Sequence, residues 1–176
     1  MGGVHGGKIA SSVAIDMVSD KIKKCYNKLM PVYSFENIFL STITTANVIV
    51  NDRSYTDDEL RGMGTTIVAV IVKNGEACIA HVGDSRAYHV TPNGIEQVTK
   101  DHSVVQLLVD RGEITADEAR FHPKKHFITR ALGVMSIIDL DYCEFPINEG
   151  EAIMVCTDGL SNFVSDQTIL EIFKNS

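Results

Sequence analysis

Hydrophobic positions recur at helical spacing through the first 50 residues. Between residues 8 and 26 the apolar side chains fall about four apart, which predicts one amphipathic helix. Pro31 interrupts this pattern, and Ser34 can cap a second helix after it. The buried stripe of that second helix would consist of Ile38, Phe39, Ile43, Ala46 and Val50. The polar stretch Asn51 to Arg61 is expected to be a loop.

The period changes to that of strands after residue 64. Thr65 to Lys73 is rich in β-branched residues, and Asn74-Gly75 predicts a hairpin turn into a returning strand, Glu76 to Val82. A tight turn at Gly83-Asp84-Ser85 leads to further strands over Arg86 to Val90 and Ile95 to Thr99. This order predicts an antiparallel meander with Asp84 at a hairpin apex.

Short helices and two more strands complete the chain. Ser103 to Asp110 has an amphipathic pattern, and Thr115 to Glu118 is a capping box that opens another helix. The ranges 137–145 and 151–156 are expected to be strands joined by a turn at 148–150, and Ser165 to cap a last helix over 166–174. The sum predicts an α+β fold in layers.

Composition narrows the class of protein. The 176 residues include 16 Lys and Arg against 23 Asp and Glu, a formal charge of −7, which argues against a general nucleic-acid binder. The longest aliphatic run, Ile67 to Val72, is far shorter than the roughly 20 residues that span a bilayer, so no membrane association is expected. Four cysteines without zinc-ligand spacing favour reduced thiols and a cytoplasmic protein.

Two aspartates are candidates for metal binding. Asp158 follows the apolar run Ala152 to Cys156, so its carboxylate is expected to be held rigidly and partly desolvated, as a ligand of a hard cation requires. Asp84 lies in a turn before Arg86, which is interpreted either as a surface ion-pairing residue or as the partner of Asp84. For both aspartates the alternative is an ordinary turn residue. His81 is interpreted as a packed core residue.

Six segments in chain order carry a resemblance to a known family. They are Met1-Gly2-Gly3 with Gly7, Ala10 and Ser11; Gly62 to Thr66 (GMGTT); Ala80 to Tyr88 (AHVGDSRAY); Val98 to Ser103 (VTKDHS); Ile114-Thr115 with Glu118-Ala119, His122-Pro123 and Ile128 to Gly133 (ITRALG); and Cys156 to Leu160 (CTDGL). Together they resemble the metal-dependent serine/threonine protein phosphatases, the PPM or type 2C family, in their bacterial form. A chance match in six segments across the whole chain is improbable.

The resemblance implies a fold, a reaction and a set of site residues. The fold would be a two-layer antiparallel β-sandwich flanked by helices, with two to three Mg²⁺ or Mn²⁺ ions that activate a water for attack on phosphorus. By position, Asp158 would bind the core metals and a third metal, and Asp84 that third metal. Gly2, Gly3 and Gly159 would adjoin the metals. His102, Ser103, His122 and Arg130 would belong to a flap and substrate groove around residues 103–127. Substrates would be phosphorylated proteins, with a serine/threonine kinase as a possible opposing partner.

The chain also departs from the family pattern at both ends. The family's first strands, with a phosphate-binding Arg and an acidic ligand, have no counterpart here, and Met1 stands at the third place of a motif that normally opens with Asp-Gly. The chain ends at Ser176, before the closing Asp-Asn motif. Residues 1–176 are therefore expected to form one incomplete phosphatase domain, truncated and with impaired activity. The alternative is a non-catalytic pseudophosphatase that acts as an interaction or regulatory module.

Overall fold

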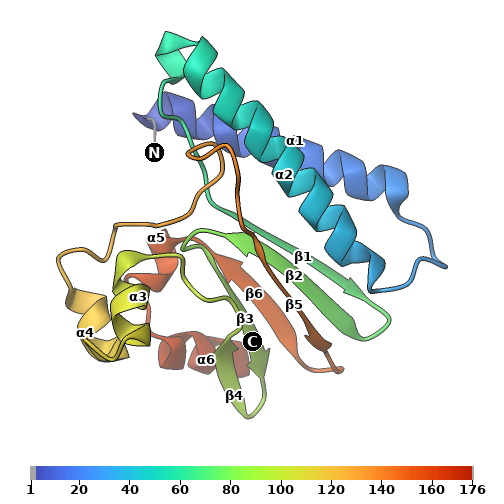
Figure 1. Ribbon diagram of the computed structural model, residues 1–176. Helices are drawn as coiled ribbons and strands as arrows, with labels where there is room; N and C mark the ends of the chain where they lie inside the picture. The colour runs from blue at the N-terminus through green and yellow to red at the C-terminus, as the bar shows by residue number, and fades with distance from the viewer. Residues whose placement is uncertain (1–2, 176) are drawn as a thin grey trace.

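Two long helices lie side by side across one sheet (Figure 1). The structure is a computed structural model that describes residues 3–175, with side chains from residue 6 onward. The first helix, α1 (Gly3–Cys25), begins before the predicted start at Lys8. The second, α2 (Ser34–Thr56), is followed by a 3₁₀ turn, η1 (Asp58–Leu60).

The polar stretch after Val50 was wrongly predicted as a loop. Residues 51–56 continue α2, and two of their hydroxyls bond to the helix's own carbonyls. Ser54 Oγ donates to the Asn51 carbonyl at 2.8 Å, and Thr56 Oγ1 donates to that of Asp52 at 3.0 Å. Ser54 is also buried, so the last turn packs as well. Polar composition is therefore compatible with a helix end here.

Six strands form two antiparallel sheets that face each other. The first sheet has the order β1 (Ile67–Lys73), β2 (Glu76–Val82), β5 (Asp141–Pro146), and the second β4 (Gly94–Gln97), β3 (Arg86–Thr91), β6 (Ala152–Cys156). The His89 ring on β3 lies 4.9 Å from the Phe145 ring on β5, so these side chains meet across the two layers. The predicted α+β sandwich flanked by helices is confirmed.

The predicted meander is wrong between β2 and β3. These strands belong to different sheets, so residues 83–85 form a crossover between layers and no hairpin apex. The more distant strands provide the partners: β2 pairs with β5 and β3 with β6. The turn at 148–150 likewise joins strands of different sheets. The Asn74-Gly75 hairpin is confirmed, with φ of 53° and 78°.

The core lies mainly between the helix pair and the first sheet. Phe39 and Ile43 of α2 pack with Cys78, Ala80 and Val82 of β2, all buried. This follows from strand alternation, since every second side chain of β2 points to the helices. On the outer face of the second sheet, α6 (Asp166–Lys174) is packed through Leu170. The layers are therefore helices, sheet, sheet and helix.

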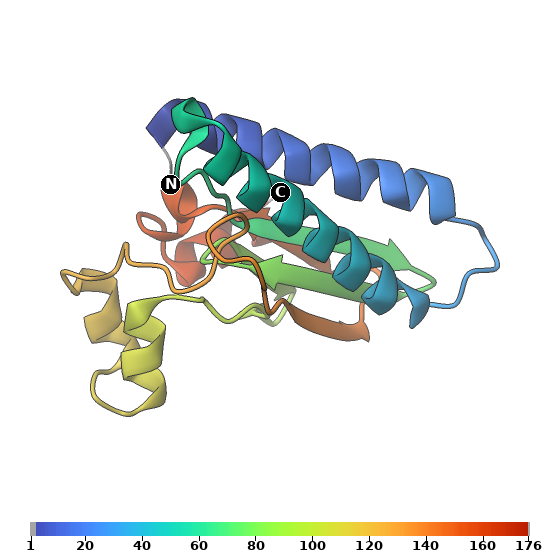
Figure 2. The ribbon, with the colours of Figure 1, turned by 45° about the horizontal axis from the view of Figure 1, so that its top comes forward.

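Two short helices stand away from the sandwich at one end (Figure 2). They are α3 (Val104–Asp110), capped by Ser103, and α4 (Ala116–Phe121), whose predicted capping box between Thr115 and Glu118 is present. One further helical turn, α5 (Asp158–Ser161), was not predicted and begins directly at Asp158. Among the described residues, no helix combines the length and apolarity that crossing a bilayer requires.

Candidate metal centre

Asp84 and Asp158 line the same cleft, at the end of the second sheet. Strand β3 pairs with β6 so that Arg86 lies opposite Cys156. Asp84 lies two residues before Arg86 and Asp158 two residues after Cys156, so both aspartates lie just beyond the same end of this ladder. The cleft has a volume of about 360 Å³. Its charged lining consists of Asp84, Asp101, Asp117, Asp158 and Asp166 with Arg86, Arg120 and Lys125.

The environments of the two carboxylates differ from the prediction. Asp158 is exposed, whereas Asp84 is half-buried, so the partial desolvation expected for Asp158 belongs to Asp84. Burial raises the pKa of Asp84 above its ordinary value, and the negative charge of Asp158 raises it further. Two oxygen donors that repel each other beside a cleft fit a hard divalent cation, which would offset the repulsion.

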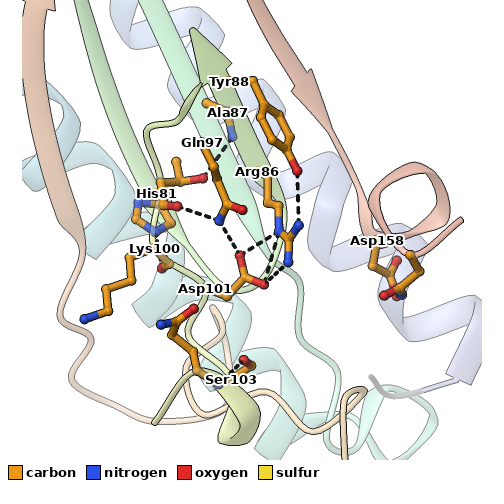
Figure 3. Close-up of polar contacts among 12 residues, drawn as sticks. His81, Arg86, Ala87, Tyr88, Gln97, Lys100, Asp101, Ser103 and Asp158 are labelled. Carbon is orange, nitrogen blue, oxygen red and sulfur yellow. Dashed lines mark hydrogen bonds and ion pairs between the residues drawn. The ribbon is translucent and has the colours of Figure 1, made fainter. Parts of the chain in front are cut away.

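Arg86 is the partner of Asp101 and not of Asp84. Its Nε and Nη2 donate to the Asp101 carboxylate at 2.9 and 2.8 Å, and Nη1 donates to the Tyr88 hydroxyl at 3.1 Å (Figure 3). Gln97 Nε2 donates to the same carboxylate at 3.0 Å. Burial lowers the pKa of Arg86, but the hydrogen bonds that Arg86 donates to Asp101 and the charge of that carboxylate outweigh burial and raise it. Asp101 is thus neutralised within the cleft wall, a role that the sequence analysis missed.

The turn that carries Asp84 requires a glycine at position 83. Gly83 has φ of 114°, and a Cβ there would lie 2.3 Å from Cγ2 of Thr66. Ser85, which follows Asp84 in the chain, is also held by Thr66, because the two hydroxyls are hydrogen-bonded at 2.8 Å. Thr66 therefore holds the turn in place from both sides of Asp84. In the sequence, Thr66 stood out only as part of the Gly62 to Thr66 segment.

The four predicted groove residues are divided among three places. His102 and Arg130 meet at Asp141, with His102 Nε2 at 3.3 Å and Arg130 Nη1 at 2.8 Å from its carboxylate oxygens. Ser103 caps α3, and His122 ends α4, where its Nδ1 accepts from the Lys124 N–H. The flap side of the cleft is instead lined by Val105, Gln106 and Arg120, among others. A substrate role for the four residues stays a prediction.

His81, His102 and Asp141 form a second cluster, and their ligand atoms lie within 4.8 Å of one another. The two rings are stacked, with centroids 4.7 Å apart and planes 24° from parallel. A metal must lie near the plane of each imidazole that binds it, at about 2.1 Å from nitrogen. Stacked rings offer no such common point. Within the cluster, His102 contacts Asp141, whereas His81 is stacked on His102 and its Nε2 bonds to the Lys100 carbonyl at 2.9 Å. His81 is buried, as the packed core residue that was predicted.

The glycines that the resemblance places near the metals are only partly described. Gly159 follows Asp158 in the first turn of α5, and Gly3 is the first residue of α1. Gly2 lies outside the described residues.

Comparison with known proteins agrees with this geometry. The family model described as protein phosphatase 2C matches residues 1–176. The chain belongs to the protein phosphatase 2C family. Its relatives include the serine/threonine phosphatase stp of Listeria monocytogenes serotype 4b (strain F2365), 36% identical over 175 residues, 99% of this chain and 69% of that protein. The resemblance inferred from the six segments is thus confirmed.

Solved structures of the protein phosphatase 2C family match the fold closely. The crystal structure of a bacterial serine phosphatase superposes with a TM-score of 0.90 at 32% identity, and covers 97% of this chain and 68% of that chain. The catalytic domain of the phosphatase PstP, in complex with 2 manganese ions, superposes with a TM-score of 0.81 at 31% identity, and covers 97% of this chain and 69% of that chain. The predicted choice of Mg²⁺ or Mn²⁺ as cofactor agrees with this manganese complex.

Proposed function

We propose that this chain contributes to metal-dependent hydrolysis of phosphoserine and phosphothreonine in proteins, with Asp84 and Asp158 as metal ligands. The observation that carries the proposal is that both carboxylates line one cleft, just beyond the end of the β3–β6 ladder. The raised pKa of Asp84 supports it, because the cause includes the charge of Asp158. Family membership supplies the reaction class.

The chain's own residues would prepare the cleft for a phosphorylated peptide. Asp84 and Asp158 provide hard oxygen donors, and a bound Mg²⁺ or Mn²⁺ would supply a water of lowered pKa as the nucleophile. Arg120 and Lys125 line the same cleft from the flap side and would attract the phosphate. The ion pair between Arg86 and Asp101 also lines the cleft and holds these two side chains against each other.

The setting of the reaction follows from the same proposal. Phosphorylated proteins would be the substrates, and a serine/threonine kinase would supply them. We place the chain in the cytoplasm, because its cysteines at positions 25, 78, 143 and 156 are all free thiols.

The test is Mn²⁺-dependent hydrolysis of p-nitrophenyl phosphate. We expect turnover that EDTA abolishes and that Asp158→Asn lowers by more than about 100-fold, because even outer partners of metal ligands are worth about 10–100-fold. Asp139→Asn removes the same charge from an exposed site outside the cleft and should retain the wild-type rate. No turnover and no Mn²⁺ binding by the wild type would instead support the non-catalytic interaction module.

A further inference from the structure

His102 binds both backbone groups of the glycine before Asp84. The Gly83 N–H donates to His102 Nδ1 at 3.1 Å, and the His102 N–H donates to the Gly83 carbonyl at 2.9 Å. His102 is buried, with 6% of its surface exposed, so both bonds are shielded from water. Gly83 is thus held on both sides by one residue that does not line the cleft, through its ring at the N–H and through its backbone at the carbonyl.

The ring of His102 is itself held in one orientation. Because Nδ1 accepts from Gly83, the proton of the neutral ring is on Nε2, which faces the Asp141 carboxylate at 3.3 Å. Arg130 Nη1 donates to the other oxygen of Asp141 at 2.8 Å and also lies 3.2 Å from His102 Nε2, so the Asp141 carboxylate is shared by both groups. Carboxylates commonly fix a histidine tautomer in this way beside metal sites.

The backbone of His102 also joins the two ends of the flap. The Thr129 N–H donates to the His102 carbonyl at 2.7 Å, and Ser103 forms an isolated bridge with Ile128. His102 therefore lies between the Asp84 turn and both ends of the flap. A change in this residue would be transmitted to the turn directly, through hydrogen bonds.

We propose that His102 is a positioning residue for Asp84, and that it sets metal affinity by holding the Gly83 N–H through Nδ1. The Asp141 carboxylate keeps the His102 ring in the orientation that this bond needs. This inference rests on the proposed function, because it takes Asp84 as a metal ligand. His102 does not line the cleft, so its effect on the metal would be exerted through Gly83.

The experiment compares two variants that each keep one nitrogen position of the ring. In His102→Asn the amide oxygen replaces Nδ1 and can still accept from Gly83. In His102→Gln the amide replaces Nε2 and reaches Asp141, but the acceptor for Gly83 is lost. Mn²⁺ affinity is measured by electron paramagnetic resonance of the free ion, with Asp84→Asn as the reference for loss of a ligand.

We expect His102→Gln to weaken Mn²⁺ binding by about tenfold or more, and His102→Asn to stay nearer the wild type. The Gly83 amide proton, followed by NMR in the metal-free protein, should shift in His102→Gln and little in His102→Asn. Equal affinities in the two variants and the wild type, or equal losses in both variants, would overturn the inference. Binding that survives Asp84→Asn would overturn the proposed function instead. Loss in Asp84→Asn with full retention in His102→Gln would overturn the positioning role alone.

Discussion

The half-buried carboxyl of Asp84 destabilises the metal-free chain at neutral pH. Its pKa is raised by burial and by the charge of Asp158, so the folded state holds a carboxylate less favourably than the unfolded state does. A carboxyl of this kind contributes stability only while it is protonated. That contribution is fully present below the unfolded pKa of 3.8 and is lost as the pH rises through the folded pKa.

Asp84→Asn should therefore raise the melting temperature in EDTA at pH 7. The gain should shrink as the pH is lowered, and vanish below the unfolded pKa, because both proteins then carry an uncharged side chain. Melting curves of variant and wild type, compared at each pH, measure it. Saturating Mn²⁺ should reverse the order, because a bound ion stabilises only the protein that retains the ligand. A lower melting temperature of the variant at pH 7 would contradict the argument.

The sequence located the two carboxylates but not the residues that support them. Asp84 and Asp158 stand out because each follows a strand, and that pattern is local. The bond from Arg86 to Asp101 spans 15 positions, and the bond from Gly83 to His102 spans 19. Such pairs depend on how the chain folds back. The sequence shows these residues as members of separate motifs, and only the fold brings them into contact.

Helix α4 is the element most dependent on its own capping. The side chains of α4 include no buried residue, so little packing holds it. The Thr115 N–H donates to Glu118 Oε2 at 2.7 Å, and the Glu118 N–H donates to Thr115 Oγ1 at 3.2 Å. Short helices without tertiary packing are marginal in water.

Thr115→Ala should open α4 without unfolding the chain. The lost cap is worth about 1 kcal/mol, and amide exchange in α4 should accelerate while the melting temperature changes little. The matched variant is Ser165→Ala, at the N-cap of α6. Its cost should appear in the melting temperature, because α6 is anchored by the buried Leu170. A large fall in the melting temperature of Thr115→Ala would show that α4 is part of the cooperative core.

At the level of elements, periodicity predicted which helices and strands form but not which strands pair with one another. All six strands and every α-helix of residues 3–175, except the short α5, were expected from local patterns within short windows. Pairing of β2 with β5 joins His81 to Asp141, a separation that no local pattern encodes. Chain proximity favoured a β2–β3 hairpin, but the crossover at Gly83 overrode it. The last turns of α2 were predicted as a loop because of their polar composition, although Ser54 and Thr56 bond to carbonyls within the helix.

On the scale of the whole molecule, stability depends on the contact between α2 and the first sheet. Phe39 is 1% exposed in that core, whereas the adjacent Leu40 is 48% exposed. Phe39→Ala should lower the free energy of unfolding by about 3–5 kcal/mol, through lost burial and the remaining cavity. Leu40→Ala should cost below about 1 kcal/mol. Urea unfolding gives both values, and similar costs would place the core elsewhere.

The register of β3 on β6 also determines where the chain can change in length. An extra residue in the turn at 92–93 would enlarge a loop at the far end of the hairpin and leave positions 84 and 158 beside the same cleft. An extra residue within β6 would turn every later side chain of that strand to the opposite face, and carry Asp158 out of the cleft. Insertions and deletions are therefore tolerable at one end of the second sheet and disabling at the other.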